Sequence, residues 1–378
     1  MIITNAKIFN GIKFLDEDSI KIKKGKIIDI FKKENKNFSN EEIMDIKNYI
    51  LAPGLIDIHT HGAGGLNSLE IKKPEDIFKI TKSYAKTGTT AVVLTTVYSF
   101  FKKDHLKLIS KHKNKYTRIL GIYLESPFVN LKKRGMIHDQ YVMKDIDDPY
   151  VLIEDIMKNC GNALKIITVA PEIKASYKIQ RYFKNNKIII AFGHSLANYE
   201  QTKMAIKNGA QLATHFLNAM NPIHHRNPGP AVAILENKNV FIEIIADGNH
   251  IHPSVIKLIY NIAGKNRIIL ITDATGDKIL KDGIYNNKRY GKVIIKNNGV
   301  YSLDGVLIGT NLSLLDMCKN MKNWLNLKIE DVLQMVTYNP HKLLGEKIGM
   351  IEKGFFADFV ILDEELNLKK VLINGKRV

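Results

Sequence analysis

Short apolar segments alternate with longer stretches of helical periodicity through most of the chain. The apolar segments are rich in Ile and Val, as strands are, and they lie at 55–59, 90–95, 118–124, 164–169, 187–192, 211–214, 240–246 and 267–272. Helical spacing fills the intervals, for example at 74–87 and at 198–208, where Gly209 is a stop signal. Near-continuous apolar strands that alternate with helices favour a parallel sheet. The eight repeats predict an α/β fold with a (β/α)8 TIM-type barrel.

The two ends of the chain have a different pattern, typical of antiparallel strands joined by polar turns. The strand-like segments are 2–9, 19–23 and 26–31 at the amino end, and 359–362 and 370–373 at the carboxyl end. Lys24-Gly25 and Asn374-Gly375 are turn signals. Both ends carry too many Ile, Val and Phe residues to be frayed appendages, so we expect them to pack into one small β-sandwich. The predicted domains are a sandwich formed by 1–52 and 345–378, and a barrel formed by 53–344.

The composition excludes several classes of protein. Of the 378 residues 45% are hydrophobic, which supports a sizeable core and excludes a disordered or fibrous chain. No apolar run approaches the roughly 20 residues of a transmembrane helix. The start of the chain lacks the basic and apolar segments of a secretory signal. Only two cysteines occur, Cys160 and Cys318, too few for a disulfide framework, so we expect a reducing compartment and a cytoplasmic location.

A large excess of positive charge raises the question of nucleic-acid binding. The chain has 56 Lys and Arg against 38 Asp and Glu, a formal net charge of +18. The lysines are scattered from Lys7 to Lys376, without runs of like charge and without aromatic residues between them as a stacking platform. A solvated surface is therefore favoured over a nucleic-acid groove or a membrane contact, and the charge favours an anionic small substrate.

The strongest local motif is the segment 53–62, Pro-Gly-Leu-Ile-Asp-Ile-His-Thr-His-Gly. Residues two apart on a strand point to the same face, so His59 and His61 would project together from the end of the first barrel strand. Two imidazoles in this position can hold one metal ion. Taken alone, the motif is also compatible with two unrelated histidines.

Ionisable residues also follow four other apolar strands. Glu125 follows the third strand, His194 the fifth, His215 the sixth and Asp273 the eighth. Each could be a satisfied core residue or a helix cap, but an ionisable group beside an apolar strand costs free energy unless it is paired or binds a metal. Active sites of such barrels form at the carboxyl ends of the strands. The recurrence at one end of separate strands predicts a metal site.

Several segments occur in an order that identifies a family. They are 53–65, 121–130, 193–195, 214–220, 226–229, 246–250 and 272–274. In this order they resemble the amidohydrolase superfamily and, within it, the deacetylases of N-acetylglucosamine 6-phosphate. The resemblance covers nearly the whole chain, and the Asn-Ala-Met and Asp-Gly-x-His segments are specific to that branch. It implies hydrolysis of the acetamide of this sugar phosphate to glucosamine 6-phosphate and acetate.

The resemblance implies a set of metal ligands and a catalytic base. Glu125, His194 and His215 would bind the principal divalent ion, typically Zn²⁺, with Fe²⁺, Mn²⁺ or Co²⁺ as alternatives. His59 and His61 would either hold a second ion or hydrogen-bond the nucleophilic water, so one or two ions per subunit are expected. Asp273 would take a proton from the attacking water and deliver it to the departing amine.

The resemblance also implies how the sugar phosphate is held. Asn218 and Ala219 would bind the phosphate and His250 the sugar. Arg226 would contact the phosphate in the neighbouring subunit, which implies a homodimer. The other expected contacts are Met136 and, on the loop after the last barrel strand, Leu307, Ile308 and Gly309.

Some positions depart from the family pattern, and two alternatives remain. Ile137 lies where some relatives have a carbonyl-polarising histidine, His138 is one residue late, and His224 and His225 have no assigned role. N-acetylgalactosamine 6-phosphate is an alternative substrate that differs only at C4. A non-catalytic, metal-stabilised binding protein is a further alternative, against which the intact set of ligands and base argues.

Overall fold

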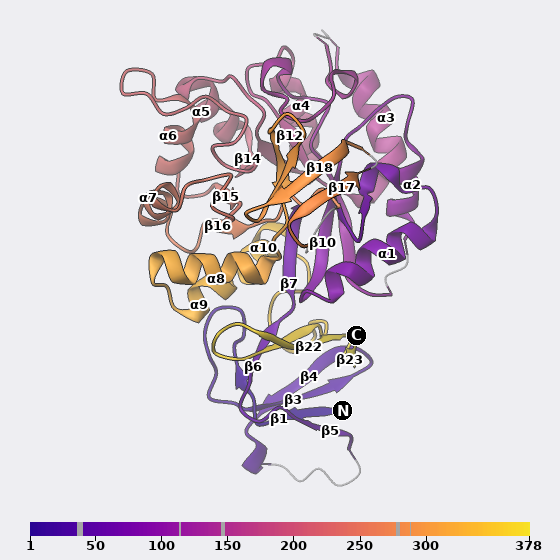
Figure 1. Cartoon of the computed structure of the whole chain (residues 1–378), viewed down its shortest axis with the longest axis vertical. Coiled ribbons are helices and arrows are strands. Elements are labelled where there is room, and N and C mark those ends of the chain that lie inside the picture. Colours follow the sequence, from indigo (N-terminus) through magenta and orange to yellow (C-terminus); the bar gives the residue numbers. More distant parts are fainter. Residues whose placement is uncertain (36–40, 113–114, 145–147, 277–279, 288) are drawn as a thin grey trace.

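Eight parallel strands form the central sheet of the computed structural model, which describes residues 1–35, 41–112, 115–144, 148–276, 280–287 and 289–378. The strands are β7 (Leu55–Thr60), β10 (Thr89–Thr96), β11 (Arg118–Leu124), β12 (Leu164–Val169), β13 (Ile189–Phe192), β14 (Ala210–Ala213), β15 (Phe241–Ile244) and β16 (Ile268–Leu270). They follow one another in the sheet in chain order, and each overlaps one of the predicted strands (Figure 1).

The two edges of this sheet meet where β7 and β16 end. The backbone N–H of Asp273 donates to the carbonyl of His59 at 2.9 Å, and the N–H of His61 donates to the carbonyl of Ala274 at 2.8 Å. The hydroxyl of Thr272 adds a 2.6 Å bond to the buried carboxylate of Asp57. These bonds join the edges of the curled sheet, and the barrel predicted from the sequence is confirmed.

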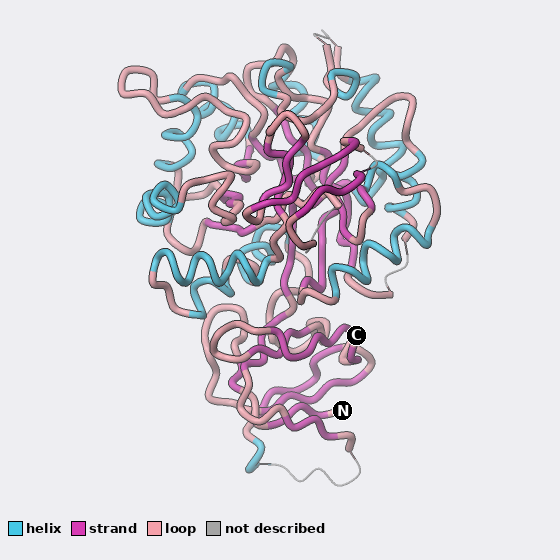
Figure 2. The backbone as a smooth tube through the Cα atoms, in the orientation of Figure 1, coloured by secondary structure: helices cyan, strands magenta, loops and turns pink. Residues whose placement is uncertain are grey.

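Helices cover the outside of the barrel (Figure 2). Those in the described residues are α1 (Pro74–Ala85), α2 (Asp104–Ser110), α3 (Tyr150–Cys160), α4 (Ser176–Asn185), α5 (Tyr199–Asn208), α6 (Gly229–Glu236), α7 (Pro253–Ala263), α8 (Leu314–Leu325), α9 (Ile329–Gln334) and α10 (Tyr338–Leu344). In α5 the side chain of Asn198 caps the first turn, and Gly209 ends the helix at φ 117°, a conformation that favours glycine. None of these helices is long and apolar enough to cross a membrane.

Strands from both ends of the chain pack together beside the barrel (Figure 1). They are β1 (Ile2–Thr4), β2 (Lys7–Ile8), β3 (Ser19–Lys23), β4 (Lys26–Phe31), β5 (Ile43–Asp45), β6 (Ile50–Pro53), β21 (Phe359–Leu362), β22 (Leu368–Ile373) and β23 (Lys376–Arg377). β6 pairs with β21, and side chains of both ends, such as Ile20 and Phe359, share one apolar cluster. The predicted antiparallel pairing is confirmed for β3 with β1 and β4 and for β21 with β22. Two strands outside the predicted set add parallel pairs, because β5 pairs with β1 and β6 with β2.

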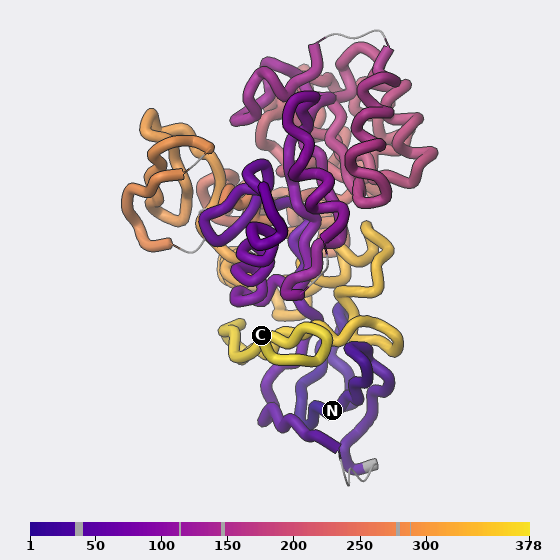
Figure 3. Tube along the Cα trace, turned by 90° about the vertical axis from the view of Figure 1, so that its right-hand side faces the viewer, coloured from indigo at the N-terminus to yellow at the C-terminus, as the bar shows by residue number. Residues whose placement is uncertain are grey.

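A further antiparallel sheet, which the sequence analysis did not predict, is inserted after β16. Its strands are β17 (Gly283–Asn287), β18 (Gly291–Lys296), β19 (Gly299–Ser302) and β20 (Leu307–Thr310). Figure 3 shows this segment projecting from the side of the barrel. Its apolar cluster consists of only a few residues, such as Val293 and Val300. The apolar run 293–295 before Asn298-Gly299 was the hairpin signal that could have predicted it. The segment 307–309 lies on a strand and not on the predicted loop.

Candidate active site

The predicted metal ligands and the predicted base meet at the carboxyl ends of the barrel strands. They are His59, His61, Glu125, His194, His215 and Asp273. All except Asp273 are at most 5% exposed. His194, His215 and Asp273 have positive φ angles of 47°, 24° and 48°, which non-glycine residues rarely adopt. Strained conformations of this kind concentrate at functional sites, and here they occur just beyond the ends of three strands.

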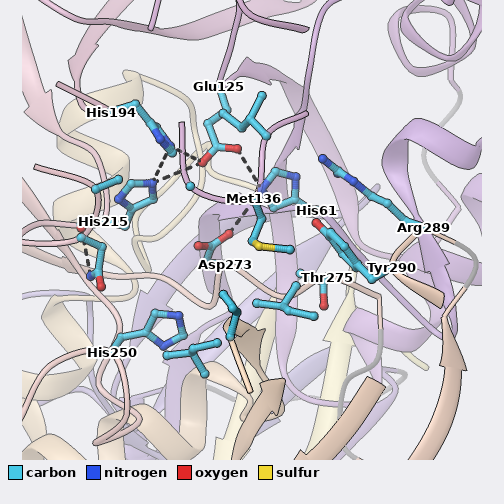
Figure 4. Close-up of a pocket in the computed structure, with 17 residues that line it drawn as sticks. His61, Glu125, Met136, His194, His215, His250, Asp273, Thr275, Arg289 and Tyr290 are labelled. Carbon is cyan, nitrogen blue, oxygen red and sulfur yellow. Dashed lines mark hydrogen bonds and ion pairs between the residues drawn. The ribbon is translucent and has the colours of Figure 1, made fainter. Parts of the chain in front are cut away.

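Glu125 lies at the centre of this cluster (Figure 4). Its Oε1 is 3.0 Å from His194 Nε2 and 3.2 Å from His215 Nε2, and these two nitrogens are 2.9 Å apart. Its Oε2 is 3.3 Å from His61 Nε2, and its Oε1 is 3.5 Å from His59 Nε2. Two groups of three possible ligands therefore share Glu125, one with His59 and His61 and one with His194 and His215.

The hydrogen bonds around the histidines fit a metal ion. His194 Nδ1 lies 2.8 Å from the carbonyl oxygen of Lys133, which can only accept, so Nδ1 carries the proton and Nε2 presents a lone pair. His59 Nδ1 donates in the same way to Glu243 Oε2 at 2.9 Å, and its buried Nε2 has no hydrogen-bond partner among the described residues. Such outer contacts orient metal-binding histidines, so the residues present fit a divalent metal.

The charges of the cluster also favour a cation. Burial opposes protonation of His59, but Glu243 and Asp273 outweigh it and raise its pKa well above the usual value. Burial also opposes protonation of His61, and there Glu125 and Asp273 raise the pKa above the usual value. Burial opposes ionisation of Glu125, yet His61 and the other histidines around it hold its pKa well below the usual value. His59 and His61 lower the pKa of Asp273 against the effect of burial. A divalent cation would thus replace protons between two ionised carboxylates.

Glu243 and Asp57 are buried carboxylates of the site that the sequence analysis missed. Glu243 Oε2 accepts hydrogen bonds from His59 Nδ1 and from the backbone N–H of His215 at 2.8 Å. Asp57 binds Thr272 at the junction of β7 and β16. Both residues interrupt strongly apolar strands, where an unpaired carboxylate would be costly. That interruption was the signal that could have found them.

Replacing Glu243 by Gln should weaken metal binding by roughly 10- to 100-fold, because the neutral amide lacks the negative charge that makes Glu243 a strong acceptor for His59 Nδ1. Titration of the metal-free protein with Zn²⁺ measures the affinity. Glu236→Gln makes the same change at an exposed position of α6 and should leave the affinity unchanged. Equal affinities for wild type and Glu243→Gln would exclude a role of Glu243 in orienting the ligands.

The cluster opens into a cavity of about 330 Å³. Its lining includes most of the predicted substrate-binding residues, namely Met136, Asn218, Ala219, His250, Leu307 and Ile308. Gly309 does not line the cavity, but a Cβ at this position would lie 2.9 Å from the carbonyl oxygen of Asp273, so it packs behind the base. Arg226 is exposed and lies outside the cavity lining of its own chain.

His250 is oriented by a neighbour within its own motif. Its Nδ1 lies 2.7 Å from Asp247 Oδ2, and Asp247 is 4% exposed. Burial opposes ionisation of Asp247, but its bonds with His250 lower its pKa. The carboxylate accepts the Nδ1 proton, which leaves the other ring nitrogen of His250 free to accept a hydrogen bond in the cavity.

The three histidines without an assigned role lie away from the cluster. His138 is exposed and caps a short 3-10 helix, where its Nδ1 accepts from the N–H of Gln140 at 3.4 Å. His224 and His225 stack on each other in an exposed loop beside Arg226. None of the three lines the cavity that contains Glu125.

The chain is similar to known hydrolases over nearly its whole length. Residues 50–378 match the amidohydrolase family. The N-acetylglucosamine-6-phosphate deacetylase of Vibrio furnissii is 34% identical over 335 residues, which are 87% of this chain and 82% of the relative. The N-acetylgalactosamine-6-phosphate deacetylase of Escherichia coli O157:H7 is 29% identical, over 86% of this chain and 87% of the relative. A mutant N-acetyl-D-glucosamine-6-phosphate deacetylase from Mycobacterium smegmatis, solved with N-acetyl-D-glucosamine-6-phosphate, has a TM-score of 0.90 at 25% identity and covers 100% of this chain and 98% of its own.

Proposed function

The chain belongs to the amidohydrolase family, and on that basis we propose that it hydrolyses the acetamide of N-acetyl-D-glucosamine 6-phosphate to D-glucosamine 6-phosphate and acetate. One observation carries this proposal. Four buried histidines and Glu125 converge beside Asp273 at the wall of a cavity of about 330 Å³. This arrangement supplies ligands for a metal and a carboxylate that can transfer protons, the two requirements of metal-assisted amide hydrolysis.

Glu125, His194 and His215 would hold the first metal ion, and His59 and His61 offer positions for a second one that shares Glu125. Imidazole and carboxylate ligands suit Zn²⁺, the metal we propose, and also Fe²⁺, Mn²⁺ or Co²⁺. When bound, the ion supplies Lewis-acid chemistry, which polarises an amide carbonyl and favours the ionisation of water.

Asp273 moves the protons in this proposal. Its Oδ1 lies 3.3 Å from His61 Nε2, and its side chain, 16% exposed, lines the cavity. As water adds to the amide carbon, Asp273 takes one of its protons. When the carbon–nitrogen bond breaks, the nitrogen keeps the electron pair and receives that proton, so no amine anion is expelled.

The remaining cavity residues hold the substrate. Asn218 and Ala219 would bind the phosphate and His250 the sugar, while Arg226 would enter the site of a second subunit in a homodimer. The exposure of Arg226 outside its own cavity supports this arrangement.

The free, buried thiols of Cys160 and Cys318 support a reducing compartment, for which we propose the cytoplasm.

Measuring acetate release from N-acetylglucosamine 6-phosphate, with the unphosphorylated sugar as a control, tests the function. We expect release from the phosphorylated sugar and loss of activity after chelation of the metal. Faster release from N-acetylgalactosamine 6-phosphate would favour the alternative substrate, to which the relative from Escherichia coli points. Absence of release from either sugar phosphate by metal-loaded protein would contradict the proposal.

Replacing Arg226 by Ala should raise KM for the phosphorylated sugar roughly 10- to 100-fold and leave the unphosphorylated sugar nearly unaffected, because only the phosphate loses a charge-assisted hydrogen bond. Arg181→Ala, an exposed position on α4, is the matched control.

Co-expression of Arg226→Ala with Asp273→Asn tests the dimer. A mixed dimer regains one complete site only if Arg226 acts in the partner, so absence of recovery would place Arg226 in its own subunit.

A further inference from the structure

The turn between β17 and β18 contributes two polar side chains to the cavity, Arg289 and Tyr290. The side chain of Asn287 builds this turn, because its Oδ1 accepts from the N–H of Arg289 at 2.8 Å and from that of Tyr290 at 2.9 Å. The turn thus holds Arg289 at the wall of the cavity. Nothing in the sequence pattern singled out either residue.

Arg289 has an unsatisfied donor inside the protein. Its Nη1 is buried and has no hydrogen-bond partner among the described residues. A guanidinium is always charged and only donates hydrogen bonds, and a buried charged donor without a partner is costly. Of the described residues that line the cavity, Arg289 alone is Arg or Lys. These two facts point to an anionic or oxygen-bearing ligand group at this position.

The position of Arg289 indicates which part of a substrate it faces. Figure 4 shows its side chain extending toward the ring of His61, on the opposite side of the cavity from His250. The neighbouring wall is formed by Met136 and Ile137, which have no hydrogen-bond donor in their side chains. The reacting carbonyl must lie at the cluster of His61, Glu125 and Asp273. Arg289 therefore lies on the acyl side of the cavity, the side that receives the acetyl group of the substrate.

We infer that Arg289 is a catalytic residue of the acyl side, which donates to the acyl oxygen of the substrate and then holds the carboxylate product. The inference rests on the proposed deacetylation. When water adds to the carbonyl carbon, the π electron pair moves to the acyl oxygen, and the guanidinium donates to this oxyanion while Asp273 takes the water proton. When the carbon–nitrogen bond breaks, the pair on the oxygen re-forms the carbonyl. The hydroxyl proton and the proton on Asp273 both end on the amine, and acetate remains beside Arg289.

Arg289→Met should lower kcat about 10²- to 10³-fold, the range seen when a single oxyanion donor is removed, with little change in KM. The loss should be the same factor for the phosphorylated and the unphosphorylated sugar, because both share the acyl oxygen. Inhibition by added acetate should become weaker in parallel. Arg289→Lys, which keeps a charged donor, should recover part of kcat.

Lys292→Met removes a positive charge from an exposed position on the same hairpin and should behave as wild type. Metal content and thermal unfolding of each variant separate a local effect from loss of the fold. A loss confined to the phosphorylated sugar would overturn the inference, because Arg289 would then bind the phosphate. Wild-type kcat and acetate inhibition in Arg289→Met would overturn it as well. Failure of wild-type protein to release acetate would instead contradict the proposed function itself.

Discussion

Asp273→Asn should retain its metal and lose at least about a hundredfold in kcat, the low end of the contribution of general acid–base catalysis. The amide keeps the size of the carboxylate and one oxygen near His61, but it cannot take up the proton of the attacking water. The ligand groups formed by Glu125 with the four histidines are unchanged. Acetate release and metal analysis of the same preparation measure both outcomes.

Asp282→Asn is a matched control, because it makes the same change at an exposed position outside the cavity lining. Turnover of Asp273→Asn within a few-fold of wild type would remove Asp273 from its role as acid and base. Loss of metal together with activity would show that Asp273 acts mainly as a ligand.

The second large effect concerns the number of metal ions. Glu125, His194 and His215 form a complete set of three ligands, so the double variant His59→Asn, His61→Asn should keep one metal per subunit and measurable deacetylation. His194→Asn should lose both the metal and the activity, because it removes the imidazole whose Nε2 lies 3.0 Å from Glu125 Oε1 and 2.9 Å from His215 Nε2.

Metal analysis of the purified variants decides between these arrangements. His225→Asn, in an exposed loop, is the control for a histidine substitution and should keep wild-type metal content. Thermal unfolding should be followed in parallel, because the double variant removes the hydrogen bond from His59 to the buried carboxylate of Glu243. A metal-free, inactive double variant would assign His59 and His61 to the primary site and contradict this set of ligands.

The barrel was predictable because its strands are buried on both faces and therefore stand out as apolar runs. The residues after those runs were predictable for the same reason, since His194 or Glu125 beside a buried strand demands a partner. Glu243 was not found, because it lies within the apolar strand β15 and not after its end, where the other ionisable residues of the site are placed. Arg289 was not found because it lies in the turn between β17 and β18, away from the apolar strands of the barrel that pointed to the other site residues.

The place where β7 meets β16 bears on when the site can form during folding. Asp57 and Thr272, which are hydrogen-bonded there, are 215 residues apart in the chain. Contacts of such long range require closure of a very large loop, and they form late in folding. His59 and Asp273 belong to the same junction, and their backbones are hydrogen-bonded to each other. A nascent chain that has not yet reached its eighth barrel strand therefore has the four histidines and Glu125 but lacks Asp273, so proton transfer becomes possible only in a nearly finished polypeptide.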